Sequence, residues 1–410
     1  KFKSRKIDII KTKRVKDYLS EITSNFYKTK PKNLFAVTGT NGKTSVADFY
    51  YQILNLNNIP VASIGTLGIK SKNRKIKTNL TSPDIITLHK NLEKIKKQKI
   101  DNVIIEASSH GLEQKRLDGL NFKAGIFTNF SQDHLDYHKT MKNYLNSKLT
   151  LFSRLLPKKS SVISDKKIKQ FVRIKKISKR RELKLFDIND KMNKIQKIKL
   201  PLVGKFQIKN LSMAVVAAQL SGLSQKKIFK SLNHIKNVEG RLDLVKIFPN
   251  NIKVFIDYAH TPDALLQLIY SIKNNYNSKI SLVFGCGGDR DKKKRNLMTK
   301  EALKYSDQII ITDDNPRFED PETIRKEMIS GISQNKLEKI TIIGNRYKAI
   351  KYAVNILGSN DILLIAGKGN EEYQIIKNKK KKFSDKKIAI NLLKKKWQSG
   401  QSKKFIRHLG

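Results

Sequence analysis

The stretch Leu34–Ser45, with the sequence LFAVTGTNGKTS, decides the fold of the first half of this chain. Its four apolar residues predict a buried strand, and a glycine-rich turn then leads into a helix expected over Ser45–Leu56. Backbone N–H groups of such a turn, together with the positive end of the helix, face a phosphate. Lys43 would reach the outer phosphates of a nucleotide, and the Thr44 hydroxyl would ligate Mg²⁺. The stretch therefore predicts a nucleotide site, although valine ends the strand where the strict Walker A pattern has glycine.

Short apolar runs alternate with helical stretches along the chain, which is the pattern of βαβ units and parallel sheets. The strands expected in the first half are Leu34–Thr38, Val61–Ile64, Val103–Glu106, Ala124–Thr128 and Ser161–Ser164. The alternation restarts after Gly240, and the strands expected there are Val254–Asp257, Ser281–Phe284, Gln308–Thr312, Ile340–Ile343 and Ile362–Ala366. The fold class predicted is α/β: a phosphate-loop domain with a mostly parallel sheet, followed by a C-terminal Rossmann-like α/β domain.

The domain boundaries follow from this alternation. Residues 1–32 are a basic helical lead-in, residues 33–238 form the phosphate-loop domain, and residues 239–410 form the second domain. Within the first domain, we expect peripheral strands and loops over Lys166–Lys197 and a helix over Asn210–Leu220.

Composition excludes several classes of protein. The 410 residues are 39% hydrophobic, and the only cysteine, Cys286, excludes a disulfide framework or a cysteine-based zinc site. No apolar run approaches the ~18 residues of a membrane span, and the first residues carry no signal peptide, so we expect a soluble, cytoplasmic protein. The 85 Lys and Arg exceed the 35 Asp and Glu by 50, but they are spread along the chain and their densest runs lack interleaved aromatic residues. We interpret this charge as a compositional bias rather than a nucleic-acid surface.

Two further polar clusters follow predicted strands of the first domain. Glu106 ends one strand, and the segment DHLDYH over residues 133–138 follows another. A carboxylate beside a phosphate loop is a natural Mg²⁺ ligand, and His134 could join it, although imidazole prefers softer ions. Hydrogen-bonded loop histidines are the alternative for His134 and His138. Because three polar clusters end strands of one sheet, we favour a site.

These segments together resemble the Mur ligase family, the ATP-dependent amide-forming enzymes of peptidoglycan synthesis. The resemblance covers roughly residues 12 to 378 and is carried by GTNGKT at 39–44, EASSHGLEQKR at 106–116, DHLDYH at 133–138 and DYAHTPD at 257–263. The shortened phosphate loop of that family explains the missing first glycine. The second segment is similar to that of the members that add the third peptide residue. The DNPR segment Asp314–Arg317 resembles those that add meso-diaminopimelate, since Arg317 offers a bidentate fork for a distal carboxylate that lysine lacks.

The resemblance implies a ligase that uses ATP and Mg²⁺ to join meso-diaminopimelate to the D-glutamate of UDP-N-acetylmuramoyl-L-alanyl-D-glutamate through an acyl phosphate. It also implies a monomer without nucleic-acid partners or membrane insertion, a hinge near residue 238, and residues 1–32 as the remnant of a UDP-binding domain that the chain otherwise lacks. Three alternatives stay open: a Mur ligase that adds L-lysine or another diamino acid, a folylpolyglutamate synthetase, and a basic nucleic-acid-binding NTPase.

The resemblance also assigns residues to roles. The catalytic residues would be Lys43, Glu106, His134 and Lys148, and the Mg²⁺ ligands Thr44, Glu106, His134 and, once N-carboxylated, Lys148. ATP would be held by Gly39, Thr40, Asn41, Gly42, Lys43, Thr44, Ser45, Asn129, Asn210, Arg241, Asp257 and His260. The UDP-sugar peptide would be held by Thr81, Ser82, Ser108, Gln114 and Arg116, and diaminopimelate by Arg290, Asp314, Asn315, Arg317, Gly367 and Glu371. Nothing in the local sequence distinguishes Lys148 from the other lysines.

Overall fold

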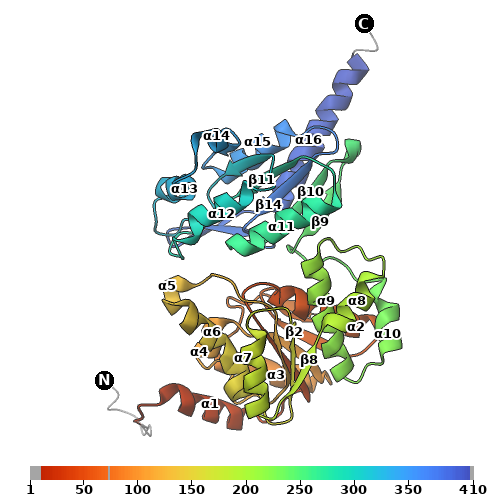
Figure 1. Cartoon of the computed structure of the whole chain (residues 1–410), viewed down its shortest axis with the longest axis vertical. Coiled ribbons are helices and arrows are strands. Elements are labelled where there is room, and N and C mark those ends of the chain that lie inside the picture. The colour runs from red at the N-terminus through yellow and green to blue at the C-terminus, as the bar shows by residue number, and fades with distance from the viewer. Residues whose placement is uncertain (1–10, 73, 407–410) are drawn as a thin grey trace.

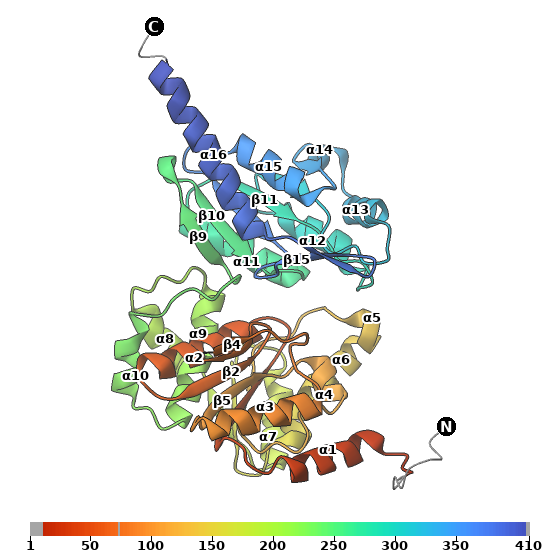
Figure 2. The same cartoon turned by 180° about the vertical axis from the view of Figure 1, so that it is seen from behind.

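The computed structural model describes residues 11–72 and 74–406. Two α/β domains lie one above the other (Figures 1 and 2). This is the predicted fold class. The first ten residues of the expected lead-in lie outside the described residues, and the rest of it contains the helix α1 (Val15–Phe26).

Within the described residues, the sheet of the first domain has eight strands in the order β4-β3-β2-β5-β1-β6-β7-β8. The strands are β1 (Asn33–Thr38), β2 (Val61–Gly65), β3 (Gly68–Ser71), β4 (Arg74–Ile76), β5 (Asn102–Glu106), β6 (Phe122–Phe127), β7 (Ser161–Ser164) and β8 (Lys184–Asp187). Neighbouring strands run parallel except where β3 pairs with β2 and β4. All five strands expected in this half are present. Because β5, β1 and β6 are neighbours, the three polar clusters meet at one edge of the sheet.

Helices cover both faces of this sheet. They are α2 (Lys43–Leu56), α3 (Ile85–Lys97), α4 (Ser109–Glu113), α5 (Leu135–His138), α6 (Met141–Thr150), α7 (Phe171–Arg180), α8 (Asn189–Gln196), α9 (Lys205–Leu220) and α10 (Gln225–Leu232), and a π-helical turn, Leu151–Leu155, extends α6. One core lies between α2, α9 and the sheet, and a second lies on the opposite face under α3. The apolar residues of β1 alternate between these two cores, which is why the strand reads as a continuous apolar run.

The prediction of peripheral strands and loops over Lys166–Lys197 was wrong. The segment holds two helices, α7 and α8, and the single edge strand β8. Ile174 and Ser178, four residues apart, form the buried face of α7, while Ile188 and Ile195 anchor α8 in the core. Abundant lysine on the solvent side hid this helical spacing in the sequence.

Within the described residues, the second domain has a six-stranded sheet in the order β13-β12-β11-β14-β10-β9. Its strands are β9 (Asp243–Ile247), β10 (Lys253–Asp257), β11 (Ile280–Phe284), β12 (Gln308–Ile311), β13 (Ile340–Ile342) and β14 (Ile362–Ala366). The five expected strands are parallel to one another, and β9, which was not expected, pairs antiparallel with β10. The hairpin of β15 (Tyr373–Ile376) and β16 (Lys379–Lys382) packs beside this sheet.

The helices of the second domain are α11 (Pro262–Asn275), α12 (Lys294–Ala302), α13 (Pro321–Ile329), α14 (Gln334–Leu337), α15 (Arg346–Ile356) and α16 (Asp385–Ile406), and Pro249–Asn251 form a short 3₁₀ turn. A fully buried ion pair of 2.7 Å between Arg346 and Asp385 ties the start of α16 to α15, and α16 then projects beyond the domain (Figure 2). Across residues 11–72 and 74–406, we find no helix with the length and apolar character that crossing a bilayer requires.

Candidate active site

The glycine-rich loop between β1 and α2 is held in place by side chains of neighbouring elements. The Asn41 N–H donates to Asn129 Oδ1 at 2.8 Å, and the Thr128 hydroxyl donates to the carbonyl of Asn41 at 2.6 Å. Gly42 caps α2 with a φ of 89°, and a Cβ on it would come within 2.6 Å of Asn210 Oδ1. Glycine is therefore required at position 42, and Asn210, a predicted ATP contact, lies directly against the loop.

Two lysines converge on one carbonyl of this loop. Lys43 Nζ donates to Gly39 O at 2.9 Å and to Thr40 O at 2.8 Å, and Lys148 Nζ donates to Gly39 O at 2.7 Å. Lys148 is only 1% exposed. Its burial and the neighbouring Lys43 charge hold the pKa of Lys148 well below its usual value. A lowered pKa favours the neutral amine, the form that can be N-carboxylated, so this environment fits the modification that the resemblance implies.

A carboxylate and a hydroxyl lie side by side next to the loop. The Thr44 hydroxyl donates to Glu106 Oε2 at 3.0 Å and accepts from Arg241 Nη2 at 3.0 Å. The backbone N–H of Thr66 fixes the other oxygen of Glu106 at 2.8 Å. Arg241 lies at the edge of the second domain. Its bond to Thr44 therefore brings the two domains into contact at the position expected for the phosphates.

Of the other ATP contacts predicted in the second domain, Asp257 supports the chain next to Arg241, whereas His260 lies beside Asp133. The Asp257 carboxylate accepts the backbone N–H groups of Leu242 and Ala259, which fixes the chain just after Arg241. Burial raises the pKa of this carboxyl. The guanidinium of Arg241 lies 4.3 Å from the ring centre of Tyr258, which keeps it directed at the loop.

The five residues predicted to hold the UDP-sugar peptide lie together beside Glu106: Thr81, Ser82, Ser108, Gln114 and Arg116. Hydrogen bonds link Ser82 to Ser108, Arg116 to Ser82 and Gln114, and Thr81 to Thr66. The Ser82 hydroxyl also donates to the Glu106 carbonyl at 2.7 Å. This cluster therefore adjoins Glu106, which lies next to the phosphate loop.

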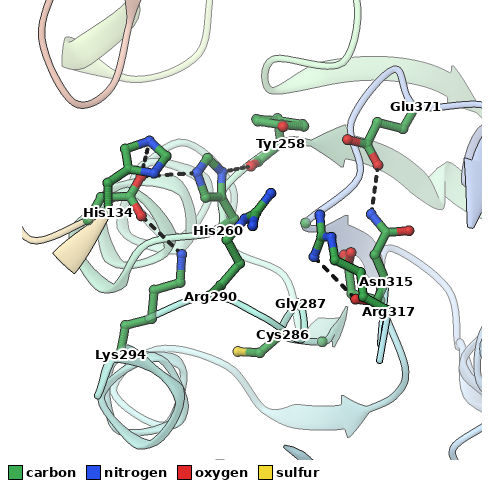
Figure 3. A pocket seen from close by; sticks show the side chains of 14 residues that line it. His134, Tyr258, His260, Cys286, Gly287, Arg290, Lys294, Asn315, Arg317 and Glu371 are labelled. Atoms are coloured by element: carbon green, nitrogen blue, oxygen red, sulfur yellow. Dashed lines mark hydrogen bonds and ion pairs between the residues drawn. The ribbon is translucent and has the colours of Figure 1, made fainter. Parts of the chain in front are cut away.

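A cavity of about 170 Å³ opens between the two domains (Figure 3). The first domain contributes Asp133 and His134 to its lining. The second contributes side chains beyond the carboxyl ends of its parallel strands: Tyr258, His260, Gly285, Cys286, Gly287, Arg290, Lys294, Asp314, Asn315, Arg317, Gly367 and Glu371. All six residues predicted for the amino-acid pocket are among them. Such a crevice is where open α/β sheets bind ligands.

The cavity carries charges of both signs at defined positions. Arg317 Nη1 donates to the carbonyls of Gly288 and Asn315 at 2.8 and 3.3 Å, which fixes the guanidinium plane. Burial, reinforced by the nearby charge of Arg290, lowers the pKa of Arg317. Glu371 and Asn315 lie side by side at this cavity, with Asn315 Nδ2 donating to Glu371 Oε2 at 3.1 Å (Figure 3). An amino-acid end group, with its carboxylate and ammonium, matches this pairing of guanidinium and carboxylate.

Asp133 joins the two domains across this cavity. Its Oδ1 lies 3.1 Å from Lys294 Nζ, and its Oδ2 lies 3.3 Å from His260 Nε2 and 3.4 Å from His134 Nε2. Asp133 is 3% exposed; burial opposes ionisation, but the Lys294 charge holds the pKa of Asp133 well below its usual value. Gln132 Nε2 adds a further cross-domain contact, donating to Asp291 Oδ2 at 3.0 Å.

The predicted metal ligands divide into two places. Thr44 and Glu106 are adjacent at the phosphate loop, whereas His134 lies at the cavity with Asp133 and His260. Burial lowers the pKa of His134 to about 2, which leaves a neutral ring. In the described part of the chain, no cluster of three or more His, Cys, Asp or Glu could hold a metal on its own. Mg²⁺ binds through one or two carboxylates and the phosphates of its nucleotide, and Glu106 beside Thr44 offers one such carboxylate.

Comparison with known proteins agrees with this geometry. Residues 37–218 match the Mur ligase middle domain, and residues 240–369 match the Mur ligase glutamate ligase domain. The chain belongs to the Mur ligase family. One relative is the UDP-N-acetylmuramoyl-L-alanyl-D-glutamate--2,6-diaminopimelate ligase of Rickettsia montanensis, 42% identical over 94% of this chain and 85% of the relative. The ligase of the same name from Rhizobium meliloti is 38% identical over 90% of this chain and 79% of its own.

Solved structures also resemble this Mur ligase. A UDP-N-acetylmuramoyl-L-alanyl-D-glutamate--2,6-diaminopimelate ligase aligns with a TM-score of 0.61 and 29% identity, over 93% of this chain and 82% of the other. The Mycobacterium tuberculosis folylpolyglutamate synthase complexed with ADP and AMPPCP reaches a TM-score of 0.67 at 16% identity, over 86% of this chain and 91% of the other. At that identity the second likeness shows a common fold alone.

Some residues of the site of this Mur ligase were not among the predicted ones. Asp133 stands beside a predicted ligand, and Tyr258 lies within a quoted segment, so both had a local signal. Lys368 also stands beside a predicted residue, Gly367, but lysine is so common in this chain that neither it nor Lys294 was singled out. Only the fold shows that each is buried against a carboxylate.

Proposed function

We propose that this Mur ligase adds meso-diaminopimelate to the D-glutamate of UDP-N-acetylmuramoyl-L-alanyl-D-glutamate, with cleavage of ATP to ADP and phosphate, in peptidoglycan synthesis. The observation that carries the proposal is the cavity between the domains. It places the Arg317 guanidinium and the Glu371 carboxylate on one side, opposite the phosphate-loop side with His134. The names of the relatives describe the same reaction.

The first step is activation of a carboxylate, which is a poor acyl donor until it is phosphorylated. The loop N–H groups and the N-terminus of α2 would hold the nucleotide phosphates, and Lys43 would leave its two carbonyl partners to reach them. Mg²⁺, when bound at Thr44 and Glu106, would neutralise charge that builds up on the phosphate oxygens. The D-glutamate of the UDP-sugar peptide, held near Ser82 and Arg116, would receive the phosphoryl group.

The second step is attack by the amino group of diaminopimelate on the acyl phosphate. Arg317 would grip the distal carboxylate and Glu371 the distal ammonium, so that the other amino group points across the cavity toward the phosphate loop. Phosphate leaves when the tetrahedral intermediate collapses. The contacts of Asp133 with Lys294 and His260 close the domains over the reacting groups and help to exclude water.

The test is a coupled phosphate-release assay with ATP and Mg²⁺, run with diaminopimelate and L-lysine in parallel. We expect phosphate release only when the UDP-sugar dipeptide and diaminopimelate are both present, with a product whose mass includes the added residue. Preferred use of L-lysine would support the lysine-adding alternative. Hydrolysis that nucleic acid stimulates and the amino acid does not affect would overturn the proposal. The monomeric state, the cytoplasmic location and the absence of nucleic-acid partners stay predictions.

A further inference from the structure

Lys368 lies directly behind the amino-acid pocket, in the loop between Gly367 and Gly369. Its side chain is fully buried, and it is not among the described residues that line the cavity. Its Nζ donates to Asn315 Oδ1 at 3.1 Å and to Glu371 Oε2 at 3.0 Å. A buried ammonium is costly unless anions or hydrogen-bond acceptors surround it, and here both of its acceptors belong to pocket residues.

The network around Lys368 fixes the orientation of Asn315. Asn315 Oδ1 accepts from Lys368 and from the backbone N–H of Ile375 at 2.8 Å, so this end of the amide must be the oxygen. Asn315 Nδ2 then donates to Glu371 Oε2 at 3.1 Å. Two donors select this orientation: the side-chain ammonium of Lys368 and the backbone N–H of Ile375. Replacing the ammonium by an apolar group would remove the side-chain donor.

The same network leaves one oxygen of Glu371 available. Glu371 Oε2 receives hydrogen bonds from both Lys368 and Asn315, whereas Oε1 is not engaged by either of them. Glu371 lines the cavity, where Arg317 and Arg290 also lie (Figure 3). Without a buried cation behind it, the carboxylate would lose one of the two donors that hold it in this position. Lys368 therefore keeps in place the anion meant for the substrate.

We propose that Lys368 is a positioning residue that holds Glu371 and Asn315 in the arrangement that recognises the distal ammonium of the diamino acid. The proposal rests on the function proposed above, and it concerns selectivity rather than the chemical step. Lys368 touches no reacting atom, so its removal acts on the binding of one substrate only. ATP and the UDP-sugar peptide bind to other side chains.

The test is a Lys368→Met variant, in which a side chain of similar length lacks the charge. Two amino acids are compared as substrates: diaminopimelate and 2-aminopimelate, which keeps the attacking amine and distal carboxylate but lacks the distal amino group. Lys380→Met is the matched control. Lys380 Nζ lies 4.8 Å and Lys368 Nζ 5.8 Å from the ring centre of Tyr373, but Lys380 is exposed in β16.

We expect Lys368→Met to raise the KM for diaminopimelate at least about tenfold, the scale of one charge-assisted hydrogen bond, with kcat at saturation within about threefold. The KM for 2-aminopimelate and for ATP should change less than about threefold, and Lys380→Met should match the wild type. An equal rise of KM for both amino acids, or a fall in kcat alone, would mark a general structural role and overturn the proposal.

Thermal unfolding is recorded for each variant. Lys368→Gln, which keeps one donor without the charge, replaces the Met variant if that variant does not fold, and it should show a smaller loss of preference for diaminopimelate. Failure of both variants to fold would show that Lys368 is needed for the fold, which overturns the proposal. The wild type is measured first. A wild type that does not turn over diaminopimelate refutes the proposed function itself. If the wild type prefers diaminopimelate over 2-aminopimelate and Lys368→Met shows the same preference, only the role of Lys368 is refuted.

Discussion

Replacing Arg317 by alanine is expected to remove the preference for diaminopimelate over L-lysine. The structure fixes Arg317 Nη1 on the carbonyls of Gly288 and Asn315, so the remaining guanidinium nitrogens can offer a planar fork to a carboxylate. Two charge-assisted hydrogen bonds at about 1.5 kcal/mol or more each amount to roughly 3 kcal/mol. At about 1.36 kcal/mol per factor of ten, this is a loss of about 150-fold in kcat/KM for diaminopimelate.

L-Lysine lacks the distal carboxylate, so its much lower kcat/KM should change less than about threefold in Arg317→Ala. The assay is phosphate release with each amino acid at saturating ATP and UDP-sugar dipeptide. Arg317→Lys keeps the charge without the fork and should lie between wild type and alanine. Lys379→Ala removes an exposed cation of the adjoining hairpin and should have no effect. A loss below about tenfold for diaminopimelate, or an equal loss for both amino acids, would refute the reasoning.

Three further predictions concern the loop, the domain contact and the fold. Gly42→Ala should weaken ATP binding about tenfold or more in a nucleotide titration, because the φ of 89° costs about 1–2 kcal/mol for a residue with a Cβ; unchanged affinity would contradict this. In a double-mutant cycle, Asp133→Asn and Lys294→Met should show a coupling of about 1–3 kcal/mol in kcat/KM, whereas additive effects would mean that their contact at 3.1 Å has no role in closure. Asp385→Asn should lower the free energy of unfolding in urea by about 3–5 kcal/mol, since it leaves the buried Arg346 unpaired; pairing Arg346→Met with Asp385→Leu should recover most of it.

Much of the fold followed from local patterns. The buried strands of both sheets are continuous apolar runs because helices cover both of their faces, and every expected strand is present within a residue or two. The strands that were not expected, β3, β4, β9, β15 and β16, are short and lie at sheet edges or in a hairpin. Most of their residues are partly buried or exposed, so no apolar run marked them.

The sequence by itself determined the phosphate loop, the succession of strands along the chain and the resemblance to the Mur ligases, because each depends on residues that are close together in the chain. Only the tertiary structure decided which lysines have specific partners. Lys148, Lys294 and Lys368 look like any other lysine in a chain with 85 Lys and Arg, yet each is buried against a carbonyl or a carboxylate from a distant segment or a neighbouring turn. Burial of a given lysine depends on how distant segments of the chain pack around it, and no local spacing of residues encodes that burial.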